Sequence, residues 1–304
     1  MMDRTTSPAL MLRAPYDFAR SISFWRISTG ELCEQWADGI YRRVMTVDHA
    51  PAIMALHNVG TVEQPAVTVQ VNERPASLHE LRMLEPTIRH LLGDDLDLQA
   101  FYAAVANDPV FAPVTQRLYG LKPTRSPLWE TLCYVIIGQQ ISLPFAYKLK
   151  ERLVMRYGEQ FTAGGRPLYR FPAPERLAAV DPAELVSMQF SRNKASFIIG
   201  LAQQIIAGAL DLDLLAALPT PEAIAYLTQF RGVGVWSAEF TLMRGLGRAD
   251  AIPANDAGVR NAIAGLYGER LAEEALRRFA EHWSAWSGVA ALYLLGWLRE
   301  PSKS

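Results

Sequence analysis

Short runs of hydrophobic residues at alternating positions dominate the first third of the chain. Val and Thr are frequent in these runs, and turn residues such as Asp38-Gly39 separate them. Alternation with a period of two indicates strands that bury one face, so the runs predict a small antiparallel sheet. The predicted strands cover residues 41–47, 52–57 and 66–71.

Helical periodicity replaces this pattern from residue 97 onward. Before that point, Asp17 is a suitable N-cap for a helix over residues 18–25, and Ser77 with Glu80 forms a capping-box pattern for a helix over residues 77–92. The later helices are predicted over residues 98–105, 128–157 with a break near Pro144, 174–180, 182–188, 193–207, 221–230, 235–246, 256–267 and 271–298.

These two patterns predict an α+β protein with two domains. A β-rich N-terminal domain with a small antiparallel sheet would cover residues 1–96, and an all-α domain would cover residues 97–304. Half of the residues are hydrophobic, which is enough for two cores. No apolar run is long enough to span a bilayer, and the N-terminus lacks the pattern of a secretory signal. We therefore expect a cytoplasmic protein without a membrane partner.

Charge is unevenly distributed although the net charge is only −1. Residues 1–116 carry 9 Lys and Arg against 14 Asp and Glu, whereas residues 117–304 carry 21 against 17. A polyanion would therefore meet the second part of the chain. Cys33 and Cys133 are too few to hold an iron–sulfur cluster, and the five histidines show no metal-ligand spacing, so no metal is expected.

A glycine turn joins two predicted helices at residues 227–238. Its sequence is Leu-Thr-Gln-Phe-Arg-Gly-Val-Gly-Val-Trp-Ser-Ala. Gly232 and Gly234 free the backbone for unusual dihedral angles, and the free N–H groups that open the second helix suit a phosphate. An ordinary turn between packed helices has the same pattern, so this segment alone leaves both interpretations open.

Two further polar segments stand out. Asp256 lies where a helix should begin, in the sequence Ile-Pro-Ala-Asn-Asp-Ala-Gly-Val-Arg, and such a residue is often a plain N-cap. Gln139 and Gln140 interrupt a long hydrophobic segment in the sequence Gly-Gln-Gln-Ile-Ser. They mark either a polar break where helices cross or a ligand-contacting segment.

The order and spacing of these three segments resemble the HhH-GPD superfamily of DNA glycosylases, named for a helix–hairpin–helix, a Gly/Pro-rich loop and an aspartate. Residues 14–18 with the β-rich region after them, and residues 171–177, resemble the alkylation-repair branch, the DNA-3-methyladenine glycosylase II group. The resemblance covers about residues 12–298. It implies an enzyme that flips an alkylated base out of double-stranded DNA and hydrolyses its N-glycosidic bond, leaving an abasic site.

The resemblance implies a role for each matching residue. Asp256 would be the catalytic carboxylate, and Trp236, Phe240 and Gln139 would lie at the base pocket. A monovalent cation at the hairpin is a further implication. The DNA-contacting residues would be Gln140, which fills the gap left by the flipped base, together with Ser142, Gly232, Val233 and Gly234.

One position separates two chemistries within the family. Members that also nick the strand carry a lysine at the second position after the last hairpin glycine, where its amine forms a Schiff base. Trp236 holds that position here, which predicts a monofunctional enzyme with water as the nucleophile. Two departures concern substrate range: Phe240 stands where tyrosine is common, and Trp286-Ser-Gly-Val289 replaces a W-R-S-Y-like stretch.

Two other functions stay open at this point. One is a glycosylase of the same superfamily that acts on oxidised or mismatched bases. The other is a non-catalytic helix–hairpin–helix DNA-binding protein, which would need neither Asp256 nor a pocket. Because one active site per chain needs no symmetry mate, we expect a monomer.

Overall fold

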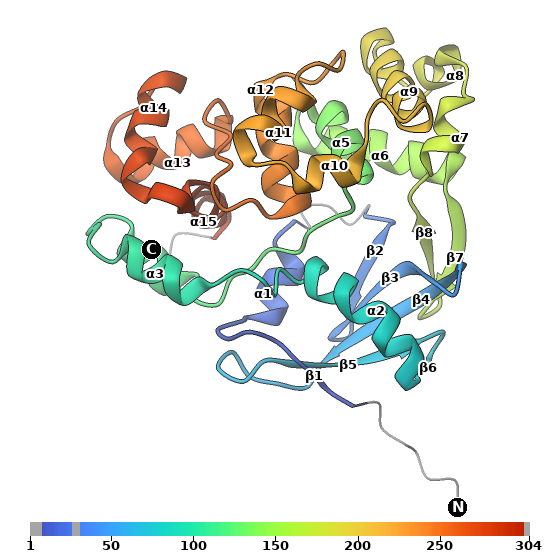
Figure 1. Ribbon diagram of the computed structural model, residues 1–304, viewed down its shortest axis with the longest axis horizontal. Helices are drawn as coiled ribbons and strands as arrows, with labels where there is room; N and C mark the ends of the chain where they lie inside the picture. The colour runs from blue at the N-terminus through green and yellow to red at the C-terminus, as the bar shows by residue number, and fades with distance from the viewer. Residues whose placement is uncertain (1–7, 26–30, 301–304) are drawn as a thin grey trace, which may run out of the picture.

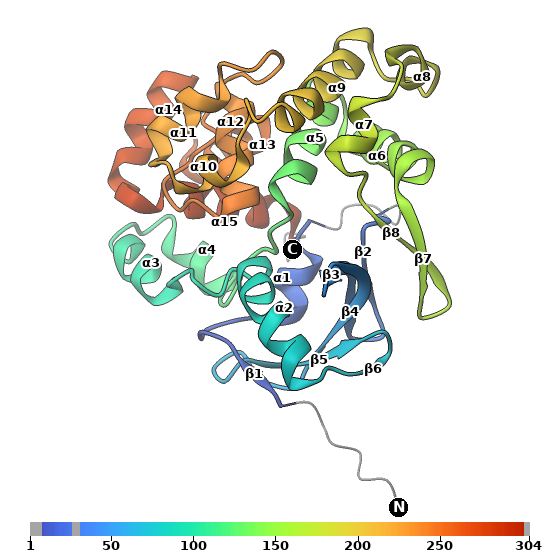
Figure 2. The same cartoon turned by 45° about the vertical axis from the view of Figure 1, so that its right-hand side comes forward.

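The fold consists of an antiparallel sheet region, at the bottom of Figure 1, and a larger helical region above it. This computed structural model describes residues 8–25 and 31–300. Helix α1 (Phe18–Ser23), which Asp17 caps as predicted, lies between the two regions (Figure 2). Its Phe18 and Ile22 pack into the core of the sheet, whereas Trp25 just beyond it packs into the helical core.

The sheet has the strand order β1-β5-β4-β3-β2, with β6 also paired to β5, and all its neighbours are antiparallel. The three predicted strands are confirmed as β3, β4 and β5, within two residues at each end. The other three strands contain only two to four residues and were not predicted. The bounds are Leu10–Met11 (β1), Glu34–Ala37 (β2), Ile40–Val47 (β3), Ala50–Asn58 (β4), Ala66–Val71 (β5) and Arg74–Pro75 (β6).

Helix α2 (Leu78–Leu91) packs against the sheet and begins with the predicted capping box. The Ser77 hydroxyl accepts a hydrogen bond from the Glu80 N–H at 3.2 Å, and the Ser77 N–H donates to the Glu80 carboxylate at 2.8 Å. This reciprocal pair satisfies two N–H groups at the start of the helix. The core between α2 and the sheet includes Leu84 and Ile88 of α2 and Tyr41, Leu56 and Val69 of the strands.

The helical region has helices in every segment predicted to be helical, although the segment 271–298 is not one helix, and it adds two short ones, α4 and α10. No helix in the described part of the chain is long and apolar enough to cross a membrane. The bounds are Leu98–Val105 (α3), Ala112–Arg117 (α4), Leu128–Gly138 (α5), Leu143–Tyr157 (α6), Pro174–Ala178 (α7), Pro182–Ser187 (α8), Arg192–Ile206 (α9), Leu212–Ala217 (α10), Thr220–Leu227 (α11), Val235–Thr241 (α12), Ala257–Tyr267 (α13), Glu273–Ala280 (α14) and Ser287–Arg299 (α15).

A β-hairpin departs from the predicted all-α character of this region. Strands β7 (Glu159–Ala163) and β8 (Arg166–Arg170) join through Gly164 and Gly165, both at positive φ. Both views show the hairpin extending from the helices down beside the sheet. The Gln35 amide of β2 donates to the Pro167 carbonyl at 2.9 Å, so the hairpin links the helical region to the sheet.

Two of the long predicted helices are interrupted. The segment 128–157 breaks near Pro144 as predicted, at residues 139–142, because Gln140 adopts a φ of +56°, and Pro144 itself fits the first turn of α6. The segment 271–298 was predicted as one helix, which is wrong. It contains α14, a 3₁₀ turn and α15, because Ser284 leaves helical geometry at a φ of 50°.

Candidate active site

A cavity of about 760 Å³ lies where α5, α12, α15 and the loop before α13 meet. It is large enough for a nucleobase, since ligand pockets begin at roughly 300 Å³. Trp25, which follows α1, also lines this cavity. Its walls include Tyr134, Gln139, Trp236, Phe240, Arg244 and Asp256.

Three hydrogen bonds hold Asp256 at the edge of this cavity. As the N-cap of α13, its Oδ1 accepts from the N–H groups of Gly258 and Val259 at 2.9 and 3.1 Å. Its Oδ2 accepts from the indole N–H of Trp236 at 3.1 Å. A Cβ at Gly258 would lie 2.6 Å from the Leu295 side chain, which would have to shift to accommodate it. The carboxylate is therefore fixed in orientation while it stays partly exposed.

The two glycines of the hairpin, Gly232 and Gly234, have different structural roles. Gly232 has a φ of +93°, and a Cβ there would lie 2.4 Å from the ring of Phe197. Gly234 is the N-cap of α12 and has open space around it. Val233 between them is buried and anchors the turn in the helical core. Gly234 therefore leaves a bare backbone surface at the start of α12.

The two glutamines diverge at the end of α5. The Gln139 amide donates to the Gly232 carbonyl and to the Ser237 hydroxyl, both at 2.9 Å, so this side chain braces the hairpin. Gln140 is exposed and held in the left-handed region. Ser142 is also exposed and caps α6 without a side-chain hydrogen bond. The structure thus brings both glutamines and Ser142 to the same cavity.

Aromatic rings form one continuous wall of the cavity. The Trp236 and Phe240 ring centroids are 5.5 Å apart, and the Phe240 and Trp25 centroids are 6.0 Å apart. The guanidinium of Arg244 lies 4.5 Å from the Trp25 ring centroid and 4.3 Å from that of Tyr134. Trp236 and Phe240 follow from the sequence motif, but Trp25, Tyr134 and Arg244 were missed.

The sequence did contain a signal that Arg244 lines the cavity, because Arg244 shares a helical face with Trp236 and Phe240. Trp236, Phe240 and Arg244 recur every four residues, so they lie on one side of a continuous helical segment. That segment runs through α12 into a π-helical turn at Leu242–Leu246. Trp25 has no comparable signal because it comes from a distant part of the sequence.

Glu239 links α12 to α14. Its buried carboxylate accepts a hydrogen bond from the Arg277 guanidinium at 2.5 Å. Burial raises the pKa of Glu239, although Arg277 opposes the shift. The side chain therefore ties α12, which carries Trp236, to α14.

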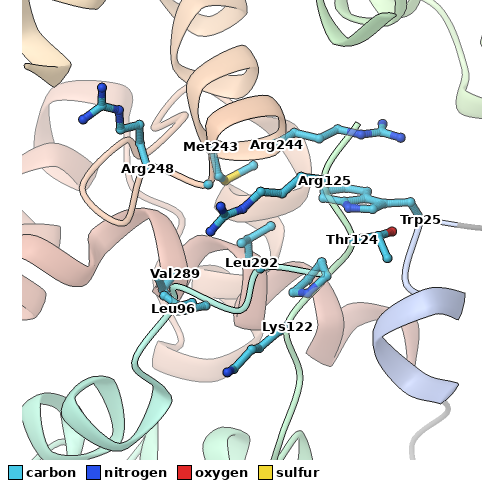
Figure 3. Close-up of a pocket in the computed structure, with 13 residues that line it drawn as sticks. Trp25, Leu96, Lys122, Thr124, Arg125, Met243, Arg244, Arg248, Val289 and Leu292 are labelled. Carbon is cyan, nitrogen blue, oxygen red and sulfur yellow. The ribbon is translucent and has the colours of Figure 1, made fainter. Parts of the chain in front are cut away.

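A second, much smaller cavity of about 20 Å³ lies behind Arg244 and is lined by three more cationic residues (Figure 3). Each of the three has its own partner. Lys122 and Arg248 donate to main-chain carbonyl oxygens at 2.8 and 2.6 Å, and Arg125 pairs with Asp95 at 2.8 Å. Burial lowers the pKa of Lys122 to about 8. The space would hold little more than one water molecule and is no base pocket.

One group of side chains could in principle bind a metal ion. The ligand atoms of Glu31, Cys33 and Glu130 all lie within 4.8 Å of one another. The Lys150 ammonium already occupies the centre, 3.0 Å from Glu31 and 2.8 Å from Glu130. Burial also raises the pKa of the Cys33 thiol, which disfavours the thiolate that a metal requires. The group therefore acts as a buried ion pair network.

Comparison with known proteins identifies the class. Residues 133–285 match the family of HhH-GPD superfamily base excision DNA repair proteins, and the chain belongs to this family. The fold class predicted from the sequence is confirmed by this match. Residues 8–126 match the AlkA N-terminal domain, which places the β-rich region in the same lineage as the alkylation-repair branch.

Individual relatives agree with this assignment. The chain is 27% identical to a DNA-3-methyladenine glycosylase of Bacillus subtilis over 92% of this chain and 93% of the relative. It is 26% identical to DNA-3-methyladenine glycosylase 2 of Escherichia coli over 93% and 95% of the two chains. The solved 3-methyladenine DNA-glycosylase from Archaeoglobus fulgidus superposes with a TM-score of 0.84 at 25% identity, covering 98% of this chain and all of that one.

An 8-oxoguanine glycosylase/lyase shares the fold as well. The structure from Clostridium acetobutylicum, in complex with double-stranded DNA, superposes with a TM-score of 0.75 at 17% identity. It covers 97% of this chain and 98% of its own. At this identity the similarity concerns the fold alone.

Proposed function

We propose that this protein is a DNA glycosylase that excises alkylated bases of the 3-methyladenine and 7-methylguanine type from double-stranded DNA. The observation that carries the proposal is the placement of Asp256 at the edge of an aromatic-walled cavity, directly beside the hairpin. The names of the relatives point to the same reaction. One complete cavity in each chain supports action as a monomer.

Binding would begin at the hairpin. The backbone around Gly234 can contact a phosphate, and such contacts fix the register of the duplex without reading its sequence. Rotating a base out of the stack costs a few kcal/mol. The exposed Gln140 side chain, at the mouth of the cavity, would fill the gap in the duplex.

The flipped base would stack on Trp236 and Phe240. An N-alkylated purine carries a positive charge, and the face of an aromatic ring attracts a cation by roughly 0.5–2 kcal/mol. This contact favours a charged, damaged base over a normal neutral one. The phenylalanine at position 240 offers a face but no hydrogen-bonding hydroxyl.

Asp256 would act on the sugar. Cleavage of the glycosidic bond leaves positive charge at the anomeric carbon, and a carboxylate held in place by Gly258, Val259 and Trp236 stabilises that charge without reorganising. It can also orient the attacking water. An alkylated base is already a good leaving group, so a second carboxylate acting as an acid is not needed.

The same geometry supports a monofunctional reaction. Trp236 stands at the position of the Schiff-base lysine, and no lysine is among the described residues that line the cavity. Without an amine near the sugar, water completes the reaction and the strand stays intact.

Release of bases from methylated duplex DNA tests the proposal. We expect free 3-methyladenine and 7-methylguanine by chromatography, no strand cleavage before alkali treatment, and no covalent complex on borohydride reduction. An oxidised-base glycosylase would instead release 8-oxoguanine. A non-catalytic DNA-binding protein would release nothing.

A further inference from the structure

Arg244 lines the cavity although its side chain is almost fully buried, at 4% exposure. Its guanidinium lies between the rings of Trp25 and Tyr134, with its central carbon 4.5 and 4.3 Å from the two ring centroids. Figure 3 shows the Arg244 side chain extending beside Trp25 and away from Arg248. The two aromatic faces hold the cation in position but satisfy none of its N–H donors.

The donors of Arg244 have no partner among the described residues. Its Nε and Nη1 are buried without a hydrogen bond, and no described carboxylate lies within ion-pair distance. A guanidinium carries five N–H donors and no acceptor. Because buried donors are almost always paired in folded proteins, unpaired ones in a cavity wall indicate an acceptor supplied by a ligand.

Arg244 lies on the helical segment that carries Trp236, about two turns farther along the chain. Asp256 is bonded to Trp236, which marks the sugar end of the cavity. Arg244 follows Trp236 by eight residues, roughly 12 Å along a helix axis. Helical side chains tilt back toward the N-terminus, so its guanidinium leans toward Phe240 and a base stacked there.

We propose that Arg244 donates a hydrogen bond to the edge of the flipped base that lies farthest from the sugar, and so selects bases with a carbonyl oxygen there. This assignment rests on the proposed glycosylase function and specifies its substrate class. At position 6 guanine presents the O6 acceptor, whereas adenine presents an amino donor. The pocket would therefore favour 7-methylguanine over 3-methyladenine relative to a pocket without the guanidinium.

Competition within one DNA sample tests this assignment. Both purines are released from the same methylated duplex and both carry a positive charge. The change in the ratio of their single-turnover release rates between the unmodified protein and a variant therefore reports the contact at position 6. Arg244→Met keeps the apolar stem and removes the donors. We expect 7-methylguanine release to fall about 10- to 100-fold, as for loss of a hydrogen bond to a charged group, and 3-methyladenine release to fall less than about threefold.

Two further variants complete the experiment. Arg248→Met removes a neighbouring arginine outside the base cavity and should leave the ratio unchanged. Arg244→Lys keeps the charge but lacks the planar guanidinium, so the ratio of 7-methylguanine to 3-methyladenine release should fall in this variant too. It keeps the test usable if Arg244→Met fails to fold. An equal loss for both bases, or an unchanged ratio in both Arg244 variants, would overturn the assignment. Release of neither base by the unmodified protein would instead refute the proposed function.

Discussion

Two buried arginines that both contact α5 have very different surroundings. Arg43 belongs to an ion cluster between the sheet and the helices, made of Glu31, Glu34, Arg43, Glu130 and Lys150. Arg43 bonds to both Glu34 and Glu130, and Lys150 bonds to Glu31 and Glu130. Arg244, in the base cavity, contacts only aromatic faces among the described side chains.

This difference separates a structural site from a functional one. A buried polar network in which every charge is paired holds two regions together in one arrangement. A buried cation with unpaired donors destabilises the free protein, and its presence is explained by a ligand that completes it. Glu130 and Tyr134 lie one turn apart on α5, so a single helix supplies both sites.

The largest effect on stability should come from breaking the ion cluster. Glu130→Ala leaves Arg43 and Lys150 buried with too few partners, and we expect a loss of about 3–5 kcal/mol in the free energy of unfolding. Denaturant titration measures this loss. The exposed pair of Glu274 and Arg278 is the matched control, since Glu274→Ala should cost less than about 0.5 kcal/mol. Equal effects would contradict the structural role of the cluster.

The cluster also predicts the behaviour of the protein in acid. Burial alone would raise the pKa of Glu130, but Arg43 and Lys150 lower it to about 2. A carboxyl group with a depressed pKa stabilises the fold above its ordinary value of 4.5, and this stabilisation is lost as the pH falls from 4.5 toward 2. Unfolding curves measured across this range should show the loss. In Glu130→Gln the free energy of unfolding should depend less on pH.

A smaller effect is expected at Gln139. Gln139→Ala leaves the Gly232 carbonyl and the Ser237 hydroxyl without their partner, at about 1–2 kcal/mol. Because these groups belong to the hairpin, we expect the dissociation constant for DNA to rise by about tenfold in a binding titration. Unchanged DNA binding with reduced stability would restrict Gln139 to a packing role.

The smallest effect on stability should come from Gln140. Its φ of +56° is unfavourable for a side chain, so Gln140→Gly should change the free energy of unfolding by less than about 1 kcal/mol. The same change removes the side chain that fills the duplex gap, and excision should slow severalfold. Gln140→Ala removes the side chain without relieving the backbone and serves as the control. Unimpaired excision by both variants would remove Gln140 from the flipping step.

Local patterns were sufficient to predict much of the fold. Strands β3 to β5 and the capping box of α2 depend on neighbours in sequence, and the structure confirms them. The hairpin of β7 and β8 was not predicted, although Gly164-Gly165 marks its turn. Its strands gain stability from a distant strand of the sheet, and periodicity over five residues does not reveal such a contact.

The residues of the candidate site can also be divided into those that the sequence predicts and those that it does not. Asp256, Trp236 and Phe240 could be inferred because a motif and a helical period link them within twenty-one residues. Tyr134 reaches the cavity only because α5 packs against α12, and Trp25 only because its ring packs against Phe240. Arg244 shares the helical face of Trp236, but its lack of partners is visible only when all the neighbours are placed.

Excision by Asp256→Asn tests the central claim most directly. The amide oxygen can still accept the two N–H bonds from the start of α13, and only the bond from the Trp236 indole N–H is lost, so the fold should be retained while the charge at the sugar is removed. We predict that single-turnover release of alkylated bases falls by about 100-fold or more, with the dissociation constant for methylated DNA within about threefold of the unmodified protein. Base release at the normal rate by this variant would contradict the assignment of Asp256 as the catalytic carboxylate.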